Sequence, residues 1–230
     1  MVYKGNKKLQ IVAVGTKMFL ENGFTGTSSA MLANELGISK GNLTFHFPTK
    51  EHLLYELVKM LTDFQWNIIV EMENKKMSNL ERYCAEIAIQ IAICEENEVA
   101  RDFYLSAYSS PMTFAHIKEW TYKKNFGIFH DRLPEWTIRD FNDVENLTSA
   151  IEGGIIREQC TERFTLERKI RVTLDNLLKI YNVEEEERTR VIDEILKMDY
   201  RKEGRRVLTK FVEYVNRINE EAMEEALNTI

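Results

Sequence analysis

A short stretch between Gly37 and Pro48 carries side chains that suit contact with a nucleic acid. It holds a lysine, Lys40, an amide, Asn42, several hydroxyl groups and an aromatic ring, Phe45. Lysine neutralises phosphate, amides and hydroxyls hydrogen-bond to base edges, and a ring packs against a thymine methyl group or a sugar. These residue types therefore indicate recognition of phosphates and bases, provided that a fold presents them on one surface.

The spacing around this stretch predicts a helix-turn-helix. Such a unit needs a small residue where its helices cross, a positive φ in the turn and apolar anchors on the second helix. Ala33, Gly37, Ile38 and Leu43 meet these needs in order. The positions left to face outward are Ser39, Lys40, Gly41, Asn42, Thr44 and Phe45. The alternative is a structural helical corner that binds nothing.

Helical periodicity extends through the rest of the chain. Apolar spacing and capping residues predict helices at 7–21, from Thr27 or Ser28 to Leu36, from Ser39 to before Pro48, and from Thr49 to about residue 74. Further helices are expected at about 78–94, 98–108, 112–129, 141–160, 166–181, 184–198 and 205–227. No strand pattern competes, so we expect an all-α protein.

Charge is distributed unevenly along the chain. Residues 1–50 carry six lysines against two glutamates, a net +4, whereas the whole chain has a net charge of −6 and residues 51–230 therefore carry −10. A basic head on an acidic body is the asymmetry expected when one end meets a polyanion. A chance cluster of lysines is the alternative explanation of so modest a charge.

Several other classes of protein are disfavoured. The sequence contains no glycine-rich phosphate loop after a strand, no G-x-S-x-G, no H-E-x-x-H and no catalytic Cys–His signature, so we expect no enzyme and no catalytic residue. The three cysteines are widely spaced, and His116 and Glu119 form only an isolated pair, so we expect no metal site. With neither a leader nor an 18-residue apolar run, we expect a cytoplasmic protein outside the membrane.

The N-terminal sixty residues resemble the DNA-binding domain of TetR-type transcriptional regulators. The matching motifs are F-x-x-x-G-F-x-x-T at 19–27, A-x-x-L-G-I-S-K-G at 33–41 and F-P-T-K-E-H-L at 47–53. The resemblance implies a helix-turn-helix head at 1–50, a connecting helix at about 50–74, and a helical effector-binding and dimerisation body at 51–230. The body would carry a C-terminal extension from about residue 183.

The same resemblance implies a function. The chain would bind a palindromic DNA operator as a homodimer and act as a repressor that releases DNA when a small-molecule effector binds, with no other cofactor. An activator, or a regulator without a ligand, stays open. A protein-interaction scaffold whose head does not bind DNA is the alternative function, because Thr44 stands where many family members carry a phosphate-contacting tyrosine.

Carrying the motifs over residue by residue gives an expected DNA-contacting set: Thr27, Ser28, Ser39, Lys40, Gly41, Asn42, Thr44, Phe45, His46 and Lys50. By the family's usual order, the dimer interface would run from Phe141 to Cys160 and from Leu166 to Tyr181. Adjacent glycines, Gly153 and Gly154, would let two helices approach closely there.

Aromatic residues gather in the first half of the body, where they suggest a cavity for a partly apolar effector. The expected lining residues are Trp66, Tyr104, Tyr108, Phe114, His116, Trp120 and Tyr122. Ordinary core packing explains aromatic residues at helical spacing equally well.

Overall fold

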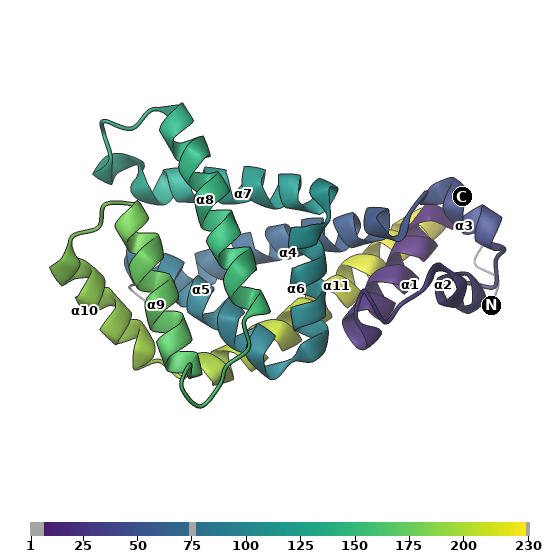
Figure 1. Cartoon of the computed structure of the whole chain (residues 1–230). Coiled ribbons are helices and arrows are strands. Elements are labelled where there is room, and N and C mark those ends of the chain that lie inside the picture. Colours follow the sequence, from purple (N-terminus) through teal and green to yellow (C-terminus); the bar gives the residue numbers. More distant parts are fainter. Residues whose placement is uncertain (1–6, 74–76, 229–230) are drawn as a thin grey trace.

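The computed structural model describes residues 7–73 and 77–228 of the chain, with the backbone alone for 66–73 and 225–228. Over these residues it consists of helices joined by short loops, with no strand, and the predicted all-α fold is confirmed (Figure 1). The elements are α1 (Lys7–Asn22), α2 (Ser29–Glu35), α3 (Lys40–His46), α4 (Lys50–Glu73), α5 (Asn79–Glu96), α6 (Glu98–Ser109), α7 (Pro111–Phe129), η1 (His130–Arg132), α8 (Ile138–Arg157), α9 (Leu166–Ile180), α10 (Glu185–Leu196) and α11 (Tyr200–Asn228).

Helices α1 to α3 form the head, and local sequence explains their ends. Ser28 caps α2 and Ser39 caps α3, each accepting a hydrogen bond from a backbone N–H three residues later. Gly37 has a φ of 61°, the left-handed conformation that the turn requires. Leu32 of α2 and Leu43 of α3 are buried together against α1. The predicted helix-turn-helix is therefore present.

The body is built around α5, which is buried on nearly all sides. A helix that is apolar all round belongs in a core, and the Ile, Ala and Cys residues of α5 meet that condition. Helices α8, α9 and α10 pack around it, and one aromatic pair, Phe129 and Tyr181, stacks with ring centroids 3.9 Å apart. Among these helices, α5 also lines the larger cavity described below.

The last helix, α11, connects the two ends of the molecule. Figure 1 shows it (yellow) running from the body to the head, where it lies beside α1. Near its start, Gly204 lets α11 cross α5 closely, since a methyl group there would lie 3.1 Å from Cγ1 of Ile93. Arg201 and Arg205 both bond to Glu96 at the end of α5. The C-terminal segment is thus an integral wall of the body.

Two helix starts lie earlier than their apolar pattern predicts. Helix α8 begins at Ile138 because Thr137 and Asp140 form a reciprocal capping box. Helix α11 begins at Tyr200 because an Asp199 oxygen accepts from the backbone N–H of Lys202 at 3.0 Å. In both cases a polar cap, placed before the first apolar position, sets the boundary.

Candidate nucleic-acid interface and ligand cavity

The surface of α3 divides sharply into a buried and an exposed side. Leu43 is 3% exposed and anchors the helix to the head, whereas Phe45 is 83% exposed. The other outward positions lie on the same exposed surface: Ser39, Lys40, Gly41, Asn42 and Thr44. A single exposed ring is ordinary on a protein surface, so Phe45 is informative only together with the exposed lysine, amide and hydroxyl groups around it.

The hydroxyl groups at this surface differ in the hydrogen bonds that they can still form with a ligand. Ser28 and Ser39 accept bonds from the backbone N–H groups of Met31 and Asn42, both at 3.2 Å, so each keeps its own O–H to donate. Thr44 instead donates its O–H to the carbonyl of Gly41 at 3.1 Å. Its oxygen is left as an acceptor, which suits a base amino group better than a phosphate.

His46 closes α3 and is half-buried. Its ring lies edge-on to Phe45, with centroids 5.2 Å apart. The histidine thus contacts Phe45 at the end of α3.

Thr27 lies inside the head and not on its surface. Its side chain is fully buried, and its hydroxyl donates to the carbonyl of Gly23 at 2.8 Å. The threonine therefore closes the loop between α1 and α2 from inside, and Ser28 is the residue that caps α2 at the surface.

Lys50 differs from its expected role for a similar reason. Its ammonium group donates to the carbonyls of Phe24 at 2.6 Å and Thr27 at 2.8 Å, and it lies 4.0 Å from the centre of the Phe24 ring. Partial burial lowers the pKa of this lysine. The side chain thus fastens α4 to the loop of the head instead of projecting toward a phosphate.

Helix α6 holds the same loop from another side. Asp102 accepts from the backbone N–H of Thr25 at 2.9 Å and from its hydroxyl at 2.7 Å. Gly23, with a φ of 79°, makes room, because a methyl group there would lie 2.7 Å from an Asp102 oxygen. The head is therefore tied to both α4 and α6.

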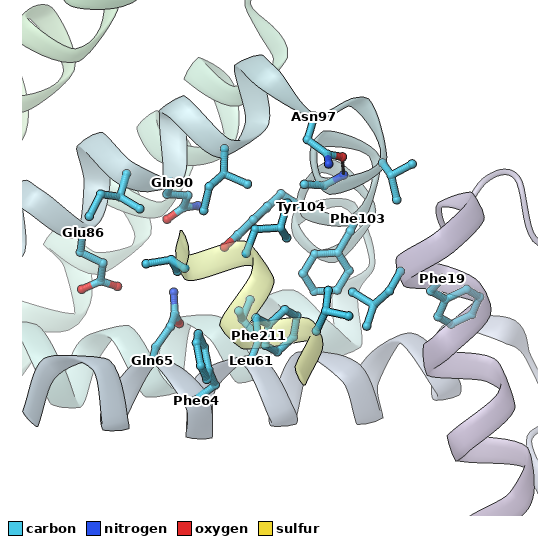
Figure 2. A pocket seen from close by; sticks show the side chains of 18 of the residues that line it. Phe19, Leu61, Phe64, Gln65, Glu86, Gln90, Asn97, Phe103, Tyr104 and Phe211 are labelled. Atoms are coloured by element: carbon cyan, nitrogen blue, oxygen red, sulfur yellow. Dashed lines mark hydrogen bonds between the residues drawn. The ribbon is translucent and has the colours of Figure 1, made fainter. Parts of the chain in front are cut away.

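A cavity of about 160 Å³ lies where the head meets the body (Figure 2). Its walls come from α1, α4, α5, α6 and α11, with Asn97 at the start of α6. The aromatic residues around it are Phe19, Phe64, Phe103, Tyr104 and Phe211. A smaller space of about 30 Å³ adjoins it, beside Tyr108, Trp120 and Glu152.

The residues expected to line a cavity separate in the structure. Tyr104 borders both spaces, and Tyr108 and Trp120 border the smaller one. His116 bonds to Thr62 at 3.1 Å instead. Phe114 packs on Tyr108, and Tyr122 packs on Phe126. Phe114 and Tyr122 border neither the cavity nor the smaller space. The Trp66 side chain lies outside the described residues.

Sequence reasoning missed the main walls of the cavity. Phe19 belongs to the head, and Phe64 and Phe211 come from helices far apart in the chain. The apolar stripe of α11 was visible in the sequence, but nothing local indicated which surface it covers. Only the packing of α11 across α4 brings Phe211 within 5.4 Å of Phe64, measured between ring centroids.

Buried acids lie beside the smaller space. Burial raises the pKa of Glu152 to about 7 and that of Glu145 to about 6. Tyr108 donates to Glu152 at 3.1 Å, and Ser149 donates to Glu145 at 2.7 Å. The nearby Lys124 is paired with Glu86, at 2.8 Å to each carboxylate oxygen. Lys124 thus forms an ion pair with Glu86, and its charge also lowers the pKa of Glu145 and Glu152 against the larger effect of burial.

The part of the chain that the structure describes contains neither a cluster of metal ligands nor a helix suited to a membrane. Over residues 7–73 and 77–228, no three His, Cys, Asp or Glu side chains are grouped so that they can hold a metal ion. In the same ranges, no helix is long and apolar enough to cross a membrane. His116 and Glu119 are turned to separate partners, Thr62 and Lys123.

The geometry of the head agrees with comparisons to known proteins. Residues 11–57 match the family described as bacterial regulatory proteins, tetR family. The chain is similar to the HTH-type transcriptional regulator QacR of Staphylococcus aureus, with 24% identity over 190 residues that cover 76% of this chain and 100% of QacR. It is also similar to the HTH-type transcriptional regulator LmrA of Bacillus subtilis, with 25% identity over 189 residues, 76% of this chain and 98% of LmrA. Among solved structures, the TetR family protein CprB from S. coelicolor A3(2) aligns with a TM-score of 0.46 and 17% identity over 81% of this chain and 96% of CprB.

Proposed function

Because this chain is a transcriptional regulator of the TetR family, we propose that it represses transcription by binding a near-palindromic operator through α3. The observation that carries the proposal is the exposure of Phe45 at 83%, beside the exposed Lys40 and Asn42, on a helix that Leu43 holds to the head. Lys40 would contact phosphate, Asn42 and Thr44 would contact base edges, and Phe45 would pack on a thymine methyl group or a sugar.

The proposed DNA surface is narrower than the sequence suggested. It consists of Ser28, Ser39, Lys40, Gly41, Asn42, Thr44, Phe45 and His46. Thr27 and Lys50 support it from inside, since their polar groups are already bonded within the chain. In this proposal residues 1–50 read DNA, and residues 51–230 bind the effector and form the dimer. Its target, chromosomal DNA, places the protein in the cytoplasm.

The proposed dimer joins α8 and α9 of two copies by a two-fold axis. Leu147 on α8 is 51% exposed and Val172 on α9 is 42% exposed, an unusual openness for large apolar side chains. Ala150 and Gly154 continue the exposed side of α8 that carries Leu147. Gly153 has another role, because it packs on Tyr108 of the same chain, where a methyl group would lie 2.9 Å from the ring.

Selection of DNA from a random duplex library by the purified full-length protein tests the proposal. We expect enrichment of a near-palindrome whose half-sites are about 10 base pairs, or a multiple of that, apart. The Phe45→Ala variant should enrich it far less. Recovery of unrelated sequences by the wild type would overturn the proposal and favour a head that binds no DNA.

A further inference from the structure

The larger cavity lies between the DNA-reading head and the body, and each side contributes walls. Phe19 and Leu20 come from α1 of the head, whereas Phe211 and Val212 come from α11. Figure 2 shows the rings of Phe19, Phe103 and Phe211 toward one end of this space. A molecule that enters the cavity therefore touches the head itself.

The opposite end of the cavity is polar. Figure 2 shows the side chains of Gln65, Gln90 and Glu86 gathered there, with the Tyr104 hydroxyl nearby. The Glu86 carboxylate is already paired with Lys124, at 2.8 Å to each oxygen, and burial raises the pKa of Tyr104, so the phenol is uncharged. The amides and the phenol can hydrogen-bond to a ligand. Of the charged residues that line the cavity, Glu86 is paired with Lys124 and Arg82 donates to Asn79, so a cationic ligand meets no unpaired carboxylate there.

Size limits the ligand as well. The cavity of about 160 Å³ is close to the roughly 150 Å³ of an engineered apolar cavity that binds benzene. Apolar walls with one polar end favour a compact ring that carries a single hydrogen-bonding group.

From this geometry we propose that the cavity is the effector site of the regulator, and that it takes an uncharged, ring-sized apolar molecule with one hydroxyl or similar group. The inference rests on the proposed function and adds to it the position of the site and the chemical class of ligand.

The same walls explain how occupancy reaches the DNA surface. Phe211 lies on α11, and two turns further along, Asn219 bonds to Thr16 of α1 at 3.0 Å. In turn, α1 packs on α2, α2 packs on α3, and the buried Leu32 and Leu43 belong to the same apolar cluster as Phe19 of α1. A ligand that separates Phe19 from Phe211 binds best when α1 has shifted relative to α11, so it favours a different head position.

Calorimetry on the full-length protein tests the site with three probes of one ring size: toluene, p-cresol and benzylammonium. The cavity predicts that p-cresol binds more tightly than toluene, and at least about tenfold more tightly than benzylammonium, whose charge has no partner there. Gln65→Leu should remove the advantage of p-cresol over toluene. If no probe binds, or if benzylammonium binds best, the inference is wrong.

Two matched tryptophan variants on α11 locate the binding. Val212→Trp fills the cavity and should weaken p-cresol binding by at least about tenfold, whereas Asn216→Trp, at an exposed position of the same helix, should change it less than about twofold. Circular dichroism and thermal unfolding establish that both variants are folded. Equal binding by Val212→Trp and wild type would place the probe elsewhere and overturn the inference.

Operator binding separates this inference from the proposed function. With a selected operator, p-cresol should lower the DNA affinity of wild type and of Asn216→Trp, but not that of Val212→Trp. If p-cresol binds in the cavity but no probe changes the DNA affinity, the coupling from the cavity through α11 and α1 to the DNA surface is contradicted. The proposed DNA-binding function then still stands. The opposite case is a protein that selects no DNA while p-cresol binds wild type and Asn216→Trp but not Val212→Trp. That result keeps the cavity as the binding site and contradicts the proposed DNA-binding function.

Discussion

Asn219 near the end of α11 donates a hydrogen bond to the hydroxyl of Thr16 in α1, at 3.0 Å and across 203 positions of the sequence. The bond is buried, and the Thr16 hydroxyl in turn donates a hydrogen bond to the carbonyl of Val12 at 2.8 Å. The C-terminal helix is thereby fastened to the helix that supports the DNA surface. Changes at this junction should act on the stability of the head.

Thr16→Val leaves the buried Asn219 amide without its acceptor, whereas Asn219→Ala removes a buried hydrogen bond but leaves Thr16 bonded to Val12. We expect Asn219→Ala and Thr16→Val each to lower the free energy of unfolding by about 1–2 kcal/mol. The double variant should lose clearly less than the sum, with a coupling of at least about 0.5 kcal/mol. Urea unfolding of the four proteins measures the cycle, and strictly additive losses would show that the two groups do not interact.

Lys50 should behave as a structural residue. Lys50→Ala removes two charge-assisted bonds to the carbonyls of Phe24 and Thr27 and should cost about 1–2 kcal/mol of unfolding free energy. The salt dependence of DNA binding should stay as in wild type, because no phosphate contact is lost. Lys40→Ala provides the opposite pattern, with unchanged stability and a weaker salt dependence. If DNA binding by Lys50→Ala depends less on salt than that of wild type, Lys50 contacts a phosphate and belongs to the DNA surface.

Glu152 should make stability depend on pH. Burial raises its pKa to about 7 in the folded protein, above the usual value of 4.5, so the folded state holds a proton that the unfolded state has lost. The stabilisation is complete below about pH 4.5 and disappears as the pH rises through about 7. It amounts to about 3 kcal/mol at most, since one pKa unit is about 1.4 kcal/mol.

The variant Glu152→Gln, which keeps an acceptor for Tyr108, isolates this effect. Urea unfolding between pH 5 and pH 8 should show a smaller loss of stability for the variant than for wild type. Parallel pH profiles would mean that Glu152 is already ionised in the folded protein.

An acid on the exposed side of α8 should break the dimer. Leu147→Glu places a charge where we propose that two copies meet, and sedimentation should show monomers at concentrations where wild type is dimeric. Asn142→Glu is the matched control, because Asn142 is exposed on another side of the same helix. If both variants stay dimeric, the interface lies away from Leu147.

The head could be predicted from sequence because its determinants are local. Ser39, Gly37 and Leu43 act through a cap, a turn conformation and a helix face, which depend on residues a few positions away. The internal contacts of Thr27 and Lys50 could not be predicted for the opposite reason. The partners of Lys50 lie 26 and 23 positions away, and only the folded chain shows that two of its three protons are donated to them.

The cavity escaped prediction because its walls come from five helices. Aromatic residues at 103–126 were visible, but spacing does not distinguish a ring that faces a cavity, such as Tyr104, from one that packs on its neighbours, such as Tyr122. The stripe of α11 was equally visible, yet its partner α1 lies at the other end of the sequence. Contacts of this kind are fixed by tertiary packing alone.

Fluorescence anisotropy of a selected operator across a salt series tests the central claim most directly. Wild type is compared with Lys40→Ala/Asn42→Ala, and with Lys123→Ala as a control lysine on α7 of the body. We expect steep weakening of wild-type binding with salt, at least about a tenfold loss in the double variant, and a salt slope smaller by about two for a dimer. Wild-type binding no tighter than to random DNA, or a double variant that matches Lys123→Ala, would contradict the assignment of α3 as the DNA-reading helix.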